Sequence, residues 1–192
     1  MRRLTIVASL IALFGAGLDA HVVVPTEFRA VVSDAVLIVR GRVTDVRSVT
    51  IPGGGIDSIA AVAIEAVLKG QADGFVYVRV PGGTVGHTRS IMIGAPTFRT
   101  GQRLELFLRP NTTDATYRPI GLTLGVFPIR PEPGSHRLVI DPPVVAGRTA
   151  AATGAAVRGD RARTAMTIGE FESLVRLMLA APAGQAIPRK ER

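Results

Sequence analysis

The pattern of hydrophobic and polar positions is most distinctive over residues 35–49, which read AVLIVRGRVTDVRSV. A solid apolar block is followed by alternation, in which Arg40 and Arg42 share one face and Gly41 lies on the other. The two-residue period then slips near Thr44–Asp45, and a bulge is the usual way to absorb such a slip. We therefore predict one long strand, bent at Gly41, that can coil around a small barrel.

Further strand patterns follow along the chain. The clearest is Arg103–Arg109, where three leucines alternate with polar residues and one phenylalanine. Turn residues separate the strands, and no alternation of strands with helices occurs, so the pattern predicts a small five-stranded all-β barrel. The other principal strands are predicted at Ile59–Leu68, Phe75–Val80 and Tyr117–Ile129, with short additional strands at Ile91–Ile93 and Arg137–Ile140.

Two helices complete the predicted elements. Glu27–Ser33 has an apolar stripe and follows Thr26, a residue suited to capping. Thr167–Glu170 has the spacing of a capping box and opens an amphipathic helix that we expect to end near Ala180. We expect this C-terminal helix to pack back on the barrel, and a helix that binds a partner protein is the alternative.

The first twenty residues fit a secretory signal peptide. Met1–Arg3 is basic, residues 4–18 form an apolar run too short and glycine-rich for a membrane span, and Ala20 suits cleavage. An uncleaved anchor is the alternative, against which Asp19 argues. We therefore expect a secreted or periplasmic protein that starts at His21 and has no transmembrane segment after signal cleavage.

The domain organisation follows from these patterns. A shift to alanine, glycine, threonine and arginine after the predicted barrel is typical of a flexible linker. We predict a signal peptide at 1–20, a β-barrel domain at 21–140, a flexible linker at 141–166, a C-terminal helix at 167–181 and a charged tail at 182–192.

The amino-acid composition limits the covalent links and the partners that this protein can have. The 192 residues include no cysteine, so an exported form would have no disulfide and no lipid-attachment cysteine. The formal net charge is +8 and falls to +7 when Arg2, Arg3 and Asp19 are removed with the signal peptide. A basic barrel could follow a phosphate backbone, with Phe75, Tyr77 and Phe107 as stacking residues. Export and the lack of tryptophan argue against a nucleic-acid partner.

Several segments together carry a resemblance: SDAVLIVRGRVTDV, AIEAVLKG, VYVRVPGGTVG, GAPTFRTGQRLELFLRP and YRPIGLTLGVFPI. Over residues 22–140 the chain resembles a family of uncharacterised exported bacterial proteins, and is similar to a module found N-terminal to some predicted matrixin-like metalloproteases. The resemblance implies an OB-like Greek-key barrel, and because its motifs are structural and not catalytic, it supports the fold more than any activity. The usual OB helix between the third and fourth strands has no counterpart in the loop-like segment 81–102.

Catalytic motifs are missing from the sequence. Neither the HExxH pattern of zinc proteases nor the GxSxG pattern of serine hydrolases occurs. Ser135 and His136 are adjacent and do not make a triad by themselves, and Glu170 and Glu172 point to different sides of a helix. We therefore predict a protein that is not an enzyme and needs no cofactor.

The alternative function is that of a copper-binding protein or enzyme with an N-terminal histidine. If cleavage follows Ala20, the amine and imidazole of His21 could together chelate copper, with His87 and His136 as further ligands. The leading hypothesis is instead a non-enzymatic module that binds a protein or a cell-envelope polymer through loops 52–57 and 81–100. By analogy with the resembling modules, the partner could be a secreted metalloprotease.

Overall fold

The computed structural model describes residues 28–141 and 165–180. The predicted signal peptide, His21, most of the predicted linker and the charged tail lie outside these residues. The described part is mainly β-structure, with one short helix at each end of it. This confirms the predicted small all-β barrel with a short N-terminal and a C-terminal helix.

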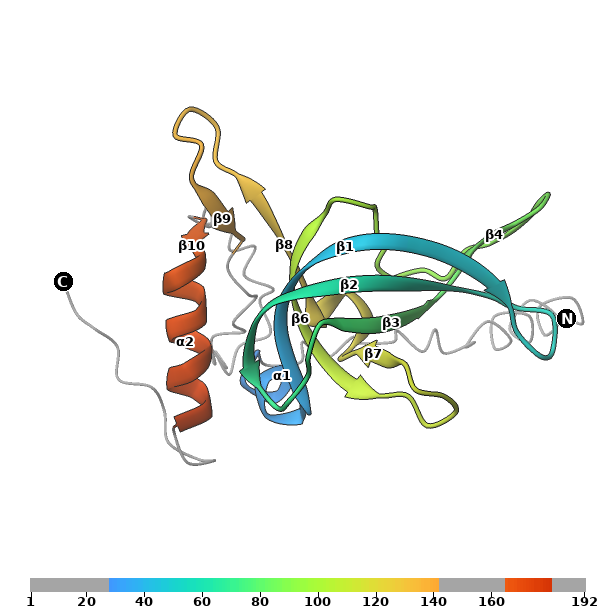
Figure 1. The fold of residues 1–192 in the computed structure, drawn as a ribbon, viewed down its shortest axis with the longest axis horizontal. Coiled ribbons are helices and arrows are strands. Elements are labelled where there is room, and N and C mark those ends of the chain that lie inside the picture. The colour runs from blue at the N-terminus through green and yellow to red at the C-terminus, as the bar shows by residue number, and fades with distance from the viewer. Residues whose placement is uncertain (1–27, 142–164, 181–192) are drawn as a thin grey trace, which may run out of the picture.

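Five strands close into a barrel (Figure 1). Their order around the barrel is β1-β2-β3-β7-β6, and a second pairing of β1 with β6 completes the circle. All neighbours are antiparallel except β3 and β7, which are parallel at Val78 and Tyr117. The bounds are β1 Leu37–Thr50, β2 Ile56–Lys69, β3 Phe75–Pro81, β6 Arg103–Pro110 and β7 Tyr117–Pro119.

Strand β1 is the long bent strand that the sequence predicts. Its first half, residues 37–42, pairs with β6 on one side, while β2 runs along the other side to Thr50. The register against β2 shifts between Val43 and Asp45, which confirms the predicted bulge. Two further shifts, after Ile38 and after Arg40, add to the curvature.

The barrel interior is filled by aliphatic side chains from alternate positions of β1, β2, β3 and β6. Leu104, Leu106 and Leu108 of β6 face inward and are fully buried, as their alternation predicts. Phe98, from the segment before β6, closes one end of this core. The remaining buried members are Leu37, Val39, Val43, Ala60, Val62, Val76, Val78 and Val80.

The segment between β3 and β6 differs from its prediction. Ile91–Ile93 is not a strand, and the short strands lie just before it as the hairpin β4 Gly83–Val85 and β5 Thr88–Ser90. The turn at Gly86 allows this pairing because its positive φ of 57° fits a tight hairpin. As expected, segment 81–102 contains no helix.

The predicted fifth strand, Tyr117–Ile129, is split in two. Gly121 and Leu122 both have left-handed backbone angles, which end β7 and start the 3-10 helix η1, Leu122–Gly125. The chain then forms β8, Val126–Pro131, which pairs with residues 103–106 of β6 on the edge opposite β1 and leaves the barrel. Strands β9, Leu138–Ile140, and β10, Met166–Thr167, extend this arm.

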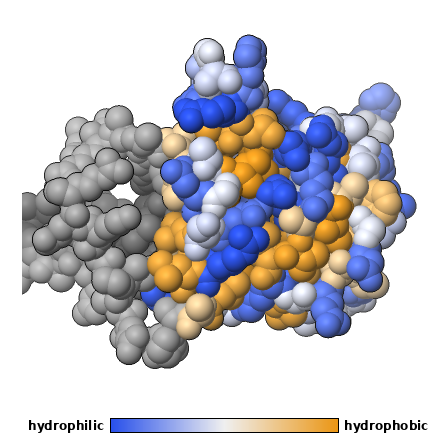
Figure 2. Space-filling view, turned by 60° about the vertical axis from the view of Figure 1, so that its left-hand side comes forward, coloured by the Kyte–Doolittle hydropathy of each residue, from blue (hydrophilic) through white to orange (hydrophobic). Residues whose placement is uncertain are grey.

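A second core lies between the outside of the barrel and the two helices. Helix α1 spans Phe28–Asp34 and α2 spans Ile168–Ala180. The rings of Phe28, Phe107 and Phe171 meet here, with centroids of Phe28 and Phe107 5.4 Å apart. This contact confirms that α2 packs on the barrel. Figure 2 brings the α2 side forward and shows hydrophobic patches interrupted by hydrophilic side chains.

The start of α2 has the predicted capping box. The Thr167 hydroxyl accepts a hydrogen bond from the backbone N–H of Glu170 at 3.2 Å. The Glu170 carboxylate in return accepts one from the N–H of Thr167 at 2.8 Å, and this bond holds the pKa of Glu170 below its usual value. The helix direction is therefore fixed where the chain leaves β10.

Gly41 provides a test of the barrel. A Cβ at this position would lie 2.5 Å from the backbone oxygen of Ala63 and 2.6 Å from Cγ1 of Val62. We expect Gly41→Ala to lower the free energy of unfolding by about 1–3 kcal/mol, because neighbouring backbone must move. Urea unfolding measures this change.

Gly169 is the matched control, because a Cβ there meets no atom within 4 Å. Gly169→Ala should leave stability unchanged or raise it by up to ~1 kcal/mol through helix propensity. Equal stability of Gly41→Ala and the unaltered protein would contradict the close approach of β1 and β2.

Candidate functional site

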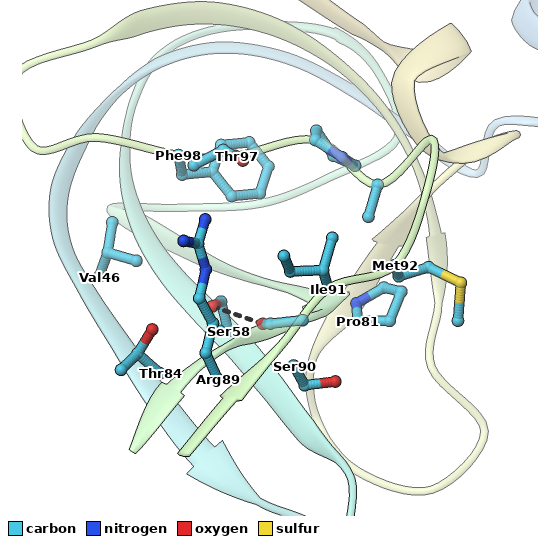
Figure 3. Close-up of a pocket in the computed structure, with 14 residues that line it drawn as sticks. Val46, Ser58, Pro81, Thr84, Arg89, Ser90, Ile91, Met92, Thr97 and Phe98 are labelled. Atoms are coloured by element: carbon cyan, nitrogen blue, oxygen red, sulfur yellow. Dashed lines mark hydrogen bonds between the residues drawn. The ribbon is translucent and has the colours of Figure 1, made fainter. Parts of the chain in front are cut away.

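A cavity of about 210 Å³ lies where the β4–β5 hairpin and the following loop cover one end of the barrel (Figure 3). We call it the loop pocket. It falls within the predicted binding loop 81–100, whereas the other predicted loop, 52–57, does not contribute to it. Its lining residues are Val46, Ser58, Pro81, Gly82, Gly83, Thr84, Arg89, Ser90, Ile91, Met92, Ala95, Pro96, Thr97 and Phe98.

Two barrel serines hold the hairpin in place. Ser58 donates a hydrogen bond to the carbonyl of Gly82 at 2.8 Å, and Ser48 accepts one from the N–H of Thr84 at 3.1 Å. Between them, Gly83 approaches so closely that a Cβ would lie 2.5 Å and 2.7 Å from the two hydroxyl oxygens. The hairpin is therefore attached through backbone contacts that only glycine permits at this point.

The lining of the loop pocket combines one cation, Arg89, with apolar and hydroxyl groups. Arg89 and Ile91 point toward the segment that carries Thr97 and Phe98, while Met92 points away (Figure 3). Within the described residues Arg89 has no ion-pair partner. None of the lining side chains is a carboxylate or an imidazole. The lining can supply apolar contact, hydroxyl hydrogen bonds and a positive charge to a ligand.

An exposed apolar run borders the pocket. Ile91 is 71%, Met92 51% and Ile93 93% exposed, so three consecutive large side chains face solvent. Isolated exposed apolar residues are ordinary, but a contiguous group beside a hollow is typical of an interaction site. The sequence pattern predicts a strand at Ile91–Ile93 and therefore does not indicate that all three side chains are exposed.

Two of the three candidate metal ligands, His87 and His136, lie in separate hairpins of the described part of the chain. His87 lies in the β4–β5 turn, and His136 lies in the β8–β9 turn with a positive φ of 54°. These two hairpins extend in different directions from the barrel (Figure 1). His21 lies outside the described residues, and residues 28–141 and 165–180 contain no group of three potential metal ligands.

The proposed stacking residues are also separated. Phe75 and Tyr77 are about half exposed on the outer face of β3. Phe107 is fully buried beneath the two helices, where it packs against Phe28 and Phe171. Only two of the three aromatic residues could therefore meet a base.

A charged cluster lies where α2 meets the barrel, with Glu105 and Glu172 buried, and the sequence pattern does not reveal it. Arg40 on β1 and Glu105 on β6 are cross-strand partners on the outer face of the barrel. Arg40 is ion-paired with Glu172 of α2 and lies 3.7 Å from Glu65 of β2. Arg103 donates to the same Glu65 carboxylate at 3.0 Å.

Glu105 is the unusual member of this cluster. It is fully buried, and neither carboxyl oxygen has a hydrogen-bond partner among the described residues. Burial, reinforced by the negative charge of Glu172, raises the pKa of Glu105 to about 8, although Arg40 opposes the shift. Glu105 is therefore predominantly protonated at neutral pH. The positive charge of Arg40 is therefore compensated by Glu172 and Glu65.

No protein-family model matches the sequence, and a search of curated proteins found no significant match. Among the helices of residues 28–141 and 165–180, none has the length and apolar character needed to cross a membrane.

Glu105 generates a prediction of pH dependence. The folded protein retains this proton up to about pH 8, whereas an unfolded chain releases it near pH 4.5. The contribution of Glu105 to stability is therefore greatest below pH 4.5 and declines as the pH rises to 8. Because of Glu105, the free energy of unfolding of the unaltered protein should fall by about 3 kcal/mol between pH 5 and pH 8. Glu105→Gln should abolish this fall.

The measurement is urea unfolding at several pH values. Asp73→Asn, which alters an exposed carboxylate, should retain the pH dependence of the unaltered protein. Parallel pH profiles for Glu105→Gln and the unaltered protein would show that Glu105 does not titrate in this range.

Proposed function

We propose that this protein is an exported, non-enzymatic binding module whose loop pocket and adjoining apolar run hold a segment of a partner protein. The observation that carries this proposal is the exposure of Ile91, Met92 and Ile93 beside a hollow. Their burial against a partner would remove apolar surface from water at roughly 25 cal/mol per Å². Arg89 would then favour a segment that also contains a carboxylate.

The chemistry of the lining supports binding in preference to turnover. Hydroxyl groups at Ser58, Thr84, Ser90 and Thr97 can hydrogen-bond a peptide backbone. A hydroxyl nucleophile needs a nearby base, and the lining of this pocket supplies neither histidine nor carboxylate. The pocket also lies on a loop held by a rigid barrel, a common arrangement for recognition.

Export and an OB-type barrel are parts of the same proposal. The basic start, apolar run and small residue at position 20 support a cleaved signal peptide. The closed five-stranded barrel supports an OB-type assignment. The resemblance to modules that precede matrixin-like proteases makes exported metalloproteases the first partners to test.

Site-specific photocrosslinking tests the proposal on the full chain in its exported fraction. A crosslinker at position 93 should give one dominant protein adduct, identified by mass spectrometry. The matched position is Leu177, half exposed on α2, where a crosslinker should not give that adduct.

Substitution then measures the contribution of the apolar run. Ile93→Ser should weaken binding of the identified partner at least ten-fold, with little change in unfolding, because the side chain is 93% exposed. Leu177→Ser removes a similar side chain and should leave affinity unchanged. The proposal fails if position 93 yields no specific adduct or if both substitutions act equally.

A further inference from the structure

A second cavity, of about 180 Å³, lies on the outside of the barrel and is lined by arginines from three adjacent strands. Arg79 belongs to β3, Arg118 to β7 and Arg109 to β6. We call this cavity the arginine pocket. It shares Pro81 with the loop pocket but contains none of the exposed apolar run.

Arg109 and Arg118 lie directly opposite each other in the β6–β7 ladder. Like charges in this arrangement destabilise a sheet, because neighbouring strands are only about 5 Å apart. Both side chains are exposed, and neither has an ion pair or a side-chain hydrogen bond within residues 28–141 and 165–180. The two positive charges therefore face the same cavity, and the one carboxylate in its lining, Asp57, lies against Arg79 instead.

Arg79 is held differently. Its Nε lies 3.6 Å from Oδ2 of Asp57, and its Nη1 lies 2.7 Å from Oδ2 of Asp114. Asp114 is itself fixed by Thr116 and Asn111, and the Thr116 hydroxyl bond holds the pKa of this carboxyl below its usual value. Two acidic groups thus position Arg79 at one side of the pocket, and the other two arginines remain available to a ligand.

We propose that the arginine pocket binds a phosphate-type oxyanion. The planar guanidinium groups of Arg109 and Arg118 can each donate two hydrogen bonds to such a group. A tetrahedral phosphate offers acceptors in more directions than a planar carboxylate, which suits donors that come from separate strands. The cavity volume exceeds that of a few water molecules, each about 30 Å³, and so accommodates a phosphate group.

The substitution pair Arg109→Gln/Arg118→Gln tests this site in the full chain. Inorganic phosphate at 50 mM should raise the melting temperature of the unaltered protein by several degrees over sodium chloride of equal ionic strength. The double variant should lose this shift, and calorimetric affinity for phosphate should fall at least ten-fold. Its melting temperature in chloride should equal or exceed that of the unaltered protein, because repulsion is relieved.

The matched control is Arg47→Gln/Arg99→Gln, which removes two exposed arginines outside the pocket. It should retain the phosphate response. If both double variants lose the phosphate-induced rise in melting temperature equally, the effect comes from the overall positive charge. If Arg109→Gln/Arg118→Gln retains this rise, the site is excluded. An equal response to acetate would replace the phosphate assignment by a carboxylate one, and no response of the unaltered protein to phosphate would overturn the proposal.

Phosphate groups occur both in soluble compounds and at membrane surfaces. Glycerol 3-phosphate represents the first source, and vesicles with phosphatidylglycerol, compared with phosphatidylcholine alone, represent the second. Binding of either probe that depends on Arg109 and Arg118 supports the oxyanion site and identifies its source. These measurements do not involve Ile93, so they can fail or succeed independently of the partner-protein proposal.

Discussion

Pairing between β1 and β6 is the constraint on which the rest of the structure depends. It joins the two ends of a row of five strands and so converts the row into a closed barrel. The same two strands carry Ile38, Arg40, Glu105 and Phe107 on their outer faces, so closure also builds the surface that receives α2. Gly41 permits the close approach of β2 at this point.

The surface beneath α2 combines aromatic packing with buried charge. The phenylalanine cluster supplies apolar contact and edge-on ring geometry, whereas the Arg40–Glu172 pair restricts how the helix can be placed. Glu105 lies beneath that pair without a hydrogen-bond partner among the described residues, at a cost to stability that rises with pH. The helix is thus held by hydrophobic contact, while the charged groups favour one position over others.

Alternation in β1, β2, β3 and β6 made the barrel predictable, because inward residues repeat with the period of a strand. The bulge and the capping box were also predictable, because each leaves a pattern in neighbouring residues of the sequence. Pairings between distant residues were not. Arg109 meets Arg118 only through the register of β6 and β7, and Ile91–Ile93 looked like a strand although no neighbour was available to pair with it.

The β4–β5 hairpin is attached to the barrel at Gly83 and through two serines. The exposed loop beyond this point forms no part of the attachment. The anchoring bonds involve the backbone of Gly82 and Thr84, so they place few demands on the side chains that follow. Residues beyond the anchor can therefore diversify while the scaffold remains the same. In this respect the barrel is suited to loop exchange, because the framework stays fixed when the exposed segment is altered.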